Sequence, residues 1–260
     1  MRRLPKTTRW RKRYSGGTNQ TFRRCAIRMR ADPSNLPALL QLASAALPVG
    51  AFSHSLGLEA ALEARVVFDA ASAEQWIADY LALAWAEGEA PLWRAQYAAW
   101  TELDEQAIAT LNAQLIAMRE TAELRMESEQ TGRSLALWLQ ALPQLHTLTD
   151  AHRAVLGSLH PPAYASVHAC AAVVLGLADE RDALYAMGWS LAENLTTAAV
   201  KLVPLGQIAG QAILRRLANH LPAWVEETLA RTPAQACNFT PMLGILSAHH
   251  ETQYTRLFRS

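Results

Sequence analysis

The sequence of 260 residues contains little cysteine and no long apolar run. Its three cysteines, Cys25, Cys170 and Cys237, are odd in number and lie at no metal-ligand spacing, which argues against a disulfide framework or a zinc site and favours a reducing compartment. The longest apolar run covers residues 169–178, whereas a membrane-spanning helix needs about 20 such residues. The sequence therefore predicts a globular protein without a transmembrane helix.

The motifs of several enzyme classes are also missing. The sequence has no Gly-x-x-x-x-Gly-Lys phosphate loop, no His-Glu-x-x-His zinc motif, no Gly-x-Ser-x-Gly nucleophile turn and no Glu-x-x-His pair of a helical di-iron site. His249 and His250 are adjacent, and consecutive helical residues diverge by about 100°, so one metal ion would rarely bind both imidazoles. We therefore expect no catalytic residue, no resident metal and no cofactor. An alternative is a helical hydrolase that uses His54 with Glu59, but no recognisable nucleophile or oxyanion donor accompanies them.

Acidic residues are absent from the first 30 positions, which hold 11 lysines and arginines. The rest of the chain carries 13 basic and 23 acidic residues, so the formal net charge of +1 conceals a strong asymmetry. We interpret residues 1–35 as a basic, disordered arm, and translation that starts at Met29 would leave residues 1–28 out of the protein. The composition also fits an organelle transit peptide. The alternative function is a helical module that binds RNA or an acidic surface through this arm, although we expect no nucleic-acid partner.

The alternation of apolar and polar residues that marks half-buried strands is almost absent after Leu36. Apolar residues instead recur at spacings of three and four, which is the period of an α-helix. No internal repeat or linker divides residues 36–260. The pattern predicts an all-α fold, an irregular single-domain bundle of about 8–10 helices, with most of the eight tryptophans in its core.

Several helix boundaries carry capping signals. Ser72-Ala-Glu-Gln75 has the form of a capping box, and Asp179 is a candidate cap for a long helix that Pro204 and Gly206 end. Shorter helices are predicted over residues 207–219, 222–231 and 241–257.

The stretch ALPVGAFSHSLGLE, residues 46–59, has a pattern that packing alone does not require. Pro48 and Gly50 end a helix, and His54 lies in the short loop before the next helix. The stretch predicts either a helix-loop-helix corner or a loop that presents His54 to a partner.

A second stretch, ENLTTAAVKLVPLGQ, covers residues 193–207. Residues spaced by three or four lie on one face of a helix, so four polar side chains form a narrow ridge opposite a leucine stripe. This ridge is a candidate binding face. Its residues are Ser190, Asn194, Thr197 and Lys201.

The last stretch, HHETQYTRLFRS at residues 249–260, combines charged residues with Tyr254, Leu257 and Phe258. Ordering these residues costs about 12–24 kcal/mol of backbone entropy, whereas burying three such side chains returns roughly 5–9 kcal/mol. The tail therefore either docks on the body of its own chain or orders on contact with a partner. We favour a partner, because the arginines at its end suit carboxylates at an interface.

Three motifs together resemble the urease accessory protein F family (UreF). They are LPVGAFSHSLGLE at 47–59, ENLTTAAVKLVPLGQ at 193–207 and HETQYTRLFRS at 250–260. The resemblance covers about residues 36–260, is weaker between about 100 and 180 and does not reach the basic arm. It implies a cytoplasmic, all-α, homodimeric chaperone that is not an enzyme and that promotes nickel insertion into apo-urease.

The resemblance also implies partners and partner-binding residues. Members of the family assemble with accessory protein D, called H in some bacteria, and with the nickel-carrying GTPase G. Leu56 stands where many members have a polar or acidic residue. The residues implied at the GTPase face are His54, Asn194, Thr197 and Lys201, and those implied in the tail that binds protein D are Glu251, Tyr254, Arg256, Leu257, Phe258 and Arg259.

Overall fold

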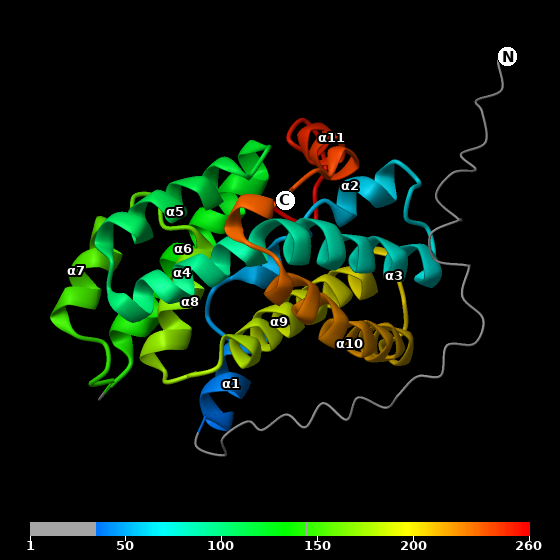
Figure 1. Cartoon of the computed structure of the whole chain (residues 1–260). Coiled ribbons are helices and arrows are strands. Elements are labelled where there is room, and N and C mark those ends of the chain that lie inside the picture. The colour runs from blue at the N-terminus through cyan, green and yellow to red at the C-terminus, as the bar shows by residue number, and fades with distance from the viewer. Residues whose placement is uncertain (1–34, 144) are drawn as a thin grey trace, which may run out of the picture. The chain divides into compact units, whose positions relative to one another are not determined.

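The computed structural model describes residues 35–143 and 145–260, and this part of the chain contains helices but no β-strand (Figure 1). Helix α3, a π-helical segment η2 (Tyr80–Glu89) and helix α4 follow one another without a break, so the eleven α-helices of the described residues form ten separate rods. The predicted all-α bundle is confirmed, while the predictions for residues 1–34 fall outside the described residues. The α-helices are α1 (Leu36–Leu42), α2 (Leu58–Glu63), α3 (Ala70–Asp79), α4 (Ala90–Glu102), α5 (Glu105–Ala117), α6 (Ala122–Ala141), α7 (Asp150–Ser158), α8 (Tyr164–Val174), α9 (Glu180–Leu202), α10 (Gln207–Ala230) and α11 (Pro241–His250).

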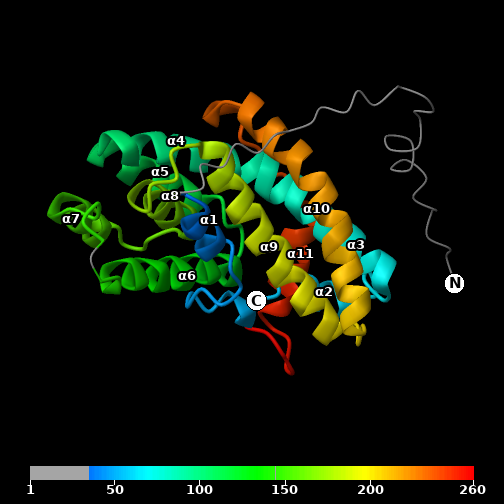
Figure 2. The ribbon, with the colours of Figure 1, turned by 90° about the horizontal axis from the view of Figure 1, so that it is seen from below.

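Helix α9 is the centre of the packing. It lies along α10 (Figures 1 and 2) and also contacts α1, α2, α3, α4 and α8. Helix α4 packs against α5 and α8, and α8 packs against α6. Trp85, Trp93 and Trp100 lie along the continuous η2 and α4 helix and are fully buried, so this helix supplies the largest side chains of the core.

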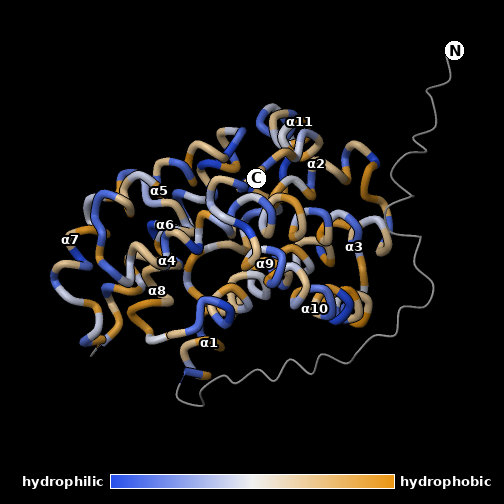
Figure 3. The backbone as a smooth tube through the Cα atoms, viewed as in Figure 1, coloured by the Kyte–Doolittle hydropathy of each residue, from blue (hydrophilic) through white to orange (hydrophobic). Residues whose placement is uncertain are grey.

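Helix α10 shows why the helical period predicted the fold. Hydrophilic and hydrophobic residues are interspersed along it (Figure 3), and its buried positions recur at spacings of three and four. Within residues 35–143 and 145–260, no helix combines the length and hydrophobicity that a bilayer crossing requires. The buried positions of α10 include Ile213, Leu217, Leu221 and Val225.

The capping predictions have mixed outcomes. Asp179 caps α9 as predicted, because its side chain accepts a hydrogen bond from the amide of Arg181 at 2.8 Å. The capping box predicted from Ser72 is wrong: α3 starts three residues earlier, with Asp69 as the N-cap and Ser72 as its partner in the box. The Asp69 carboxylate accepts from the amide of Ser72 at 2.8 Å, and the Ser72 hydroxyl accepts from the amide of Asp69 at 3.0 Å.

The prediction of two helices over 207–219 and 222–231 is also wrong, because α10 continues through Pro222. A proline inside a helix removes one hydrogen bond to the preceding turn. Leu221 and Val225 on either side of it are buried, so their packing holds the two halves of the helix in line.

The helix predicted over 241–257 ends at His250. The amides of Thr252 and Gln253 still donate to carbonyl oxygens at the end of α11, but those of Leu257 and Phe258 donate to the carboxylate of Glu59. The carboxylate of Glu251 accepts from the amide of Ala122 at 2.7 Å. That carboxylate lies at the N-terminus of α6, where the helix dipole stabilises a negative charge. Residues 251–260 therefore form a non-helical tail.

Candidate functional site

The loop between α1 and α2 is a helix-loop-helix corner. Gly50, Leu56 and Gly57 have φ angles of 77°, 51° and 82°, a left-handed region that glycine adopts without strain. Leu56 is 2% exposed, so its burial holds a conformation that leucine otherwise avoids, and position 56 offers no surface to a partner. His54 and Ser55 are 2% and 0% exposed. The loop therefore directs both of these side chains into the protein rather than presenting His54 at the surface.

The C-terminal tail forms hydrogen bonds with this corner inside the protein. A main-chain oxygen of Ser260 accepts hydrogen bonds from the amide and the hydroxyl of Ser55, both at 2.6 Å. The amide of Arg259 donates to the carbonyl oxygen of Ser53 at 2.9 Å. Nδ1 of His54 lies 2.8 Å from the Ser260 hydroxyl. The expectation that the tail waits for a partner is thus wrong, because the tail docks on its own chain.

A buried carboxylate on each of two helices also binds the tail. Glu59 of α2 accepts from the amides of Leu257 and Phe258 at 2.7 and 2.8 Å. Glu123 of α6 accepts from the Arg256 guanidinium at 2.6 Å. Glu59 and Glu123 are 5% and 4% exposed. These bonds supply stabilisation that counting apolar side chains leaves out.

His250 lies between the same two carboxylates. Its Nδ1 is 2.6 Å from Oε2 of Glu123, and its Nε2 is 3.2 Å from Oε2 of Glu59. We call Glu59, Glu123 and His250 the tail anchor. Within the described part of the chain, no group of three or more His, Cys, Asp and Glu residues is arranged to hold a metal ion.

The three apolar residues of the tail do not form one stripe. Phe258 is 6% exposed and joins the hydrophobic core, whereas Tyr254 and Leu257 are 103% and 66% exposed. A non-helical backbone does not align residues spaced by three and four. The tail is therefore held through Phe258 and its backbone, and it displays Tyr254 and Leu257 on the surface.

The polar ridge of α9 is partly buried and partly exposed. Asn194 is half-buried and donates to the carbonyl oxygen of His54 at 3.5 Å. Thr197 and Lys201 are exposed, and the Thr197 hydroxyl donates to the carbonyl oxygen of Glu193 within its own helix. The Lys201 ammonium lies over the ring of Phe258, 5.7 Å from its centroid, in cation–π geometry. The predicted GTPase face and the predicted protein D tail are thus in direct contact.

A small recess adjoins the exposed end of the ridge. It lies between α9 and α10 and has a volume of about 100 Å³. Thr197, Lys201, Gln207 and Gln211 place hydroxyl, ammonium and amide groups around it, while Gly210 keeps the two helices close. A side chain at Gly210 would meet Val200 at 2.5 Å. The recess therefore depends on a position where only glycine fits without rearrangement.

The corner keeps His54 neutral. Burial, and after it the positive charge of Arg259, lower the pKa of His54 to about 4. A neutral imidazole at this place can accept a hydrogen bond from the Ser260 hydroxyl. Asn194 of α9 donates to the carbonyl oxygen of His54, so His54 connects the tail to α9. His54 therefore holds the ridge and the tail in place and is not an exposed contact.

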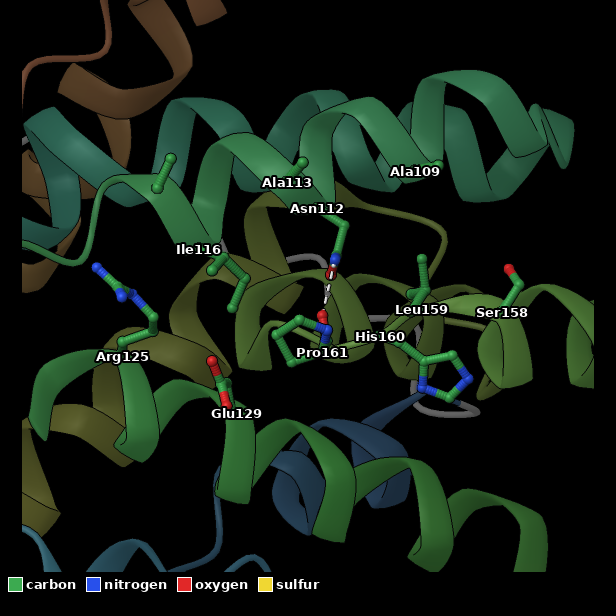
Figure 4. A pocket seen from close by; sticks show the side chains of 11 residues that line it. Ala109, Asn112, Ala113, Ile116, Arg125, Glu129, Ser158, Leu159, His160 and Pro161 are labelled. Atoms are coloured by element: carbon green, nitrogen blue, oxygen red, sulfur yellow. Dashed lines mark hydrogen bonds between the residues drawn. The ribbon is translucent and has the colours of Figure 1, made fainter. Parts of the chain in front are cut away.

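A larger groove lies at the other end of the bundle, between α5, α6 and the segment that precedes α8 (Figure 4). Its volume is about 500 Å³, and the sequence patterns did not indicate it. Asn112 and Pro161 both line the groove, and the side-chain amide of Asn112 donates to the carbonyl oxygen of Pro161 at 2.9 Å. Arg125 and Glu129 lie at one end and His160 at the other (Figure 4).

Sequence reasoning missed the tail anchor. The sequence indicates Glu59 only as a possible acid beside His54, and no motif includes Glu123. A glutamate in a largely apolar helical segment such as LEAALE is a weak signal of burial, since a charged group inside a protein needs a partner. Nothing in the spacing shows that the partner of Glu59 lies near the other end of the chain.

Comparison with known proteins agrees with these motifs. The sequence model of the UreF family matches residues 67–218. A urease accessory protein UreF from Cupriavidus pinatubonensis (strain JMP 134 / LMG 1197) is 46% identical over 228 residues, which cover 86% of this chain and 97% of that protein. Proteins of this kind are accessory proteins and not enzymes. This chain therefore belongs to the UreF family of urease accessory proteins.

Proposed function

We propose that this protein is a cytoplasmic adaptor for nickel insertion into apo-urease. It would connect accessory protein D, or H, to the GTPase G, and it would act as a homodimer. The nickel would be cargo of the assembly, and this chain would contribute binding energy rather than chemistry.

One observation carries this proposal. The α9 residues expected to bind one partner adjoin the tail residues expected to bind the other, because the Lys201 ammonium lies 5.7 Å from the centroid of the Phe258 ring. Tyr254 and Leu257 are exposed on the tail side, and Thr197 is exposed on the α9 side. Neighbouring surfaces suit a protein that joins two partners, since binding at one of them can be coupled to binding at the other.

We propose that protein D, or H, binds the exposed part of the tail, with Tyr254 and Leu257 as its apolar contacts. Aromatic and large apolar side chains supply much of the energy of protein interfaces. Within the tail, Phe258 and Arg256 would hold the segment in place, because both already have partners in this chain. Arg259 and Glu251 would act in the same way.

The test is co-purification of the chain with proteins D and G from one strain. Tyr254→Ala with Leu257→Ala should reduce capture of D at least tenfold, because losses of about 1.4 kcal/mol or more are expected for exposed interface anchors. Phe68→Ala with Leu137→Ala is the matched control, since Phe68 and Leu137 are 67% and 63% exposed on other elements. Deleting residues 249–260 would be less informative, because it would remove the buried His250.

The second arm of the same experiment uses Thr197→Glu, which changes an exposed residue of α9 whose hydroxyl donates to Glu193 in the same helix. We expect loss of G with normal retention of D. Capture of both partners by both variants, at the level of the control, would contradict the proposed adaptor function.

A further inference from the structure

His250 has an unusual environment for a histidine at the end of a helix. It is 1% exposed, and each ring nitrogen faces a carboxylate oxygen, of Glu123 at 2.6 Å and of Glu59 at 3.2 Å. A neutral imidazole carries one N–H group, and its other nitrogen is an acceptor. An ionised carboxylate only accepts. Two carboxylates can therefore both bind the ring only if both nitrogens carry a proton.

The remaining oxygen atoms favour the proton on the ring. Oε1 of Glu123 accepts from the Arg256 guanidinium at 2.6 Å, and both oxygens of Glu59 accept from the amides of Leu257 and Phe258. These donors stabilise the ionised form of each carboxylate. With His250 as an imidazolium, two negative charges are balanced by two positive charges, which is the arrangement that a buried cluster needs.

We propose that His250 is held as an imidazolium in the tail anchor and that loss of this proton releases residues 256–260 from α2 and α6. A neutral His250 would leave a nitrogen lone pair against a carboxylate and one buried negative charge without compensation. Release of the tail would hydrate Glu59 and Glu123 and so remove that cost. Rising pH thus releases the tail, which we call the latch. This inference does not depend on the proposed function.

The other charged groups near the latch do not replace the imidazolium. Glu251 lies on the N-terminus of α6, and Glu120 approaches Gly244 of α11, so both add negative charge on the same side. His249 is exposed. Arg259 lies at the far end of the tail next to His54, where it contacts Gln130 at 3.5 Å. Arg256 is the remaining cation in contact with the anchor, and it is already paired with Glu123.

Glu123→Gln provides an isosteric test. In this variant the amide oxygen can still accept from Arg256, the amide nitrogen can donate to Nδ1 of a neutral His250, and Nε2–H can donate to Glu59. Every bond of the anchor is then satisfied without the extra proton. The variant should keep its tail docked to higher pH than the natural protein. Glu63→Gln, on the exposed end of α2, is the matched control.

Docking is measured as amide exchange of residues 257–260 in the full chain between pH 6 and 10, corrected for the intrinsic exchange rate. Once rising pH removes the ring proton, protection of these amides should fall about tenfold per pH unit in the natural protein and in the control, because one proton is linked to docking. The Glu123→Gln variant should lack this fall. Equal loss of protection in all three proteins would overturn the proposal.

The protonation state itself is read from the nitrogen resonances of the His250 ring, in histidine labelled with ¹⁵N. Two protonated ring nitrogens at pH 7 are expected in the natural protein, and one in the Glu123→Gln variant. A neutral ring in the natural protein while the tail is protected would also overturn the proposal, whatever the exchange data show.

Discussion

Replacement of Glu127 by glutamine should stabilise the protein, and the gain should depend on pH. Glu127 lies on α6 and is 7% exposed, close to the ion pair between Arg119 and Glu89, whose nitrogen and oxygen are 2.9 Å apart. Burial raises the pKa of Glu127 to about 7, since Arg119 offsets only part of the cost and Glu89 adds to it. Arg119 thus faces two buried acids, Glu89 and Glu127, and it forms its ion pair with Glu89.

The size and sign of the effect follow from this pKa. The pKa of an unburied glutamate is 4.5, and a difference of about 2.5 in pKa corresponds to about 3 kcal/mol. The folded protein binds the proton more tightly, so the penalty is absent below about pH 4.5, grows up to about pH 7 and is complete above it. Glu127→Gln should therefore have nearly the stability of the natural protein at pH 5 and exceed it by about 3 kcal/mol at pH 8.5.

The assay is urea unfolding at pH 5, 7 and 8.5, with the free energy of unfolding extrapolated to zero denaturant. Glu102→Gln is the control, because Glu102 is an exposed acid at the end of α4. A constant difference between Glu127→Gln and the natural protein across this pH range would refute the reasoning, since it would mean that Glu127 does not titrate near neutral pH in the folded state.

Two further predictions concern the tail and the core. In the natural protein, amide protection of residues 257–260 should fall as pH drops from about 6.5 towards 4, because the pKa of His54 is lowered to about 4 and its protonation disfavours docking. His54→Gln should remove this acid-induced release of the tail. Release of the tail at the same pH in the variant would contradict the prediction. Gly132→Ala should lower stability by about 1–3 kcal/mol in the same urea assay, because the added carbon would lie within 2.9 Å of the backbone of Ala163 and Tyr164. Gly157→Ala, with nothing within 4 Å, should instead stabilise by about 0.5–1 kcal/mol, and equal effects of the two changes would exclude close packing of α6 and α8 as the cause.

The helical architecture could be predicted because it rests on local periodicity, whereas the exact ends of helices depend on competition between neighbours. Asp69 and Ser72 are both good caps, and Asp69 is the one used because Ser72 can bond back to it from the third position of the helix. Pro222 predicted a break from its own geometry. The burial of Leu221 and Val225 overrides that local preference, and burial by distant helices is not visible in the surrounding sequence.

The candidate site was less accessible to sequence reasoning. The motifs identified the residues of the corner, the ridge and the tail, but not that Lys201 meets Phe258 or that His54 meets Ser260. Backbone entropy set against three apolar side chains predicts an undocked tail. The hydrogen bonds that Glu59 accepts from tail amides reverse this balance, and a pairing between residues this far apart leaves no periodic pattern in the sequence.

The residues of the tail anchor lie far apart in the sequence, and this separation affects the order in which a newly synthesised chain can form their contacts. Glu59 binds groups that lie 191, 198 and 199 positions later in the sequence. While a ribosome is still synthesising α9 and α10, these partners of Glu59 do not yet exist, so the corner between α1 and α2 lacks its bonds to the tail. Contacts between residues so far apart also form slowly. The bonds of Glu59 are therefore among the last contacts of the corner that a newly made chain can form.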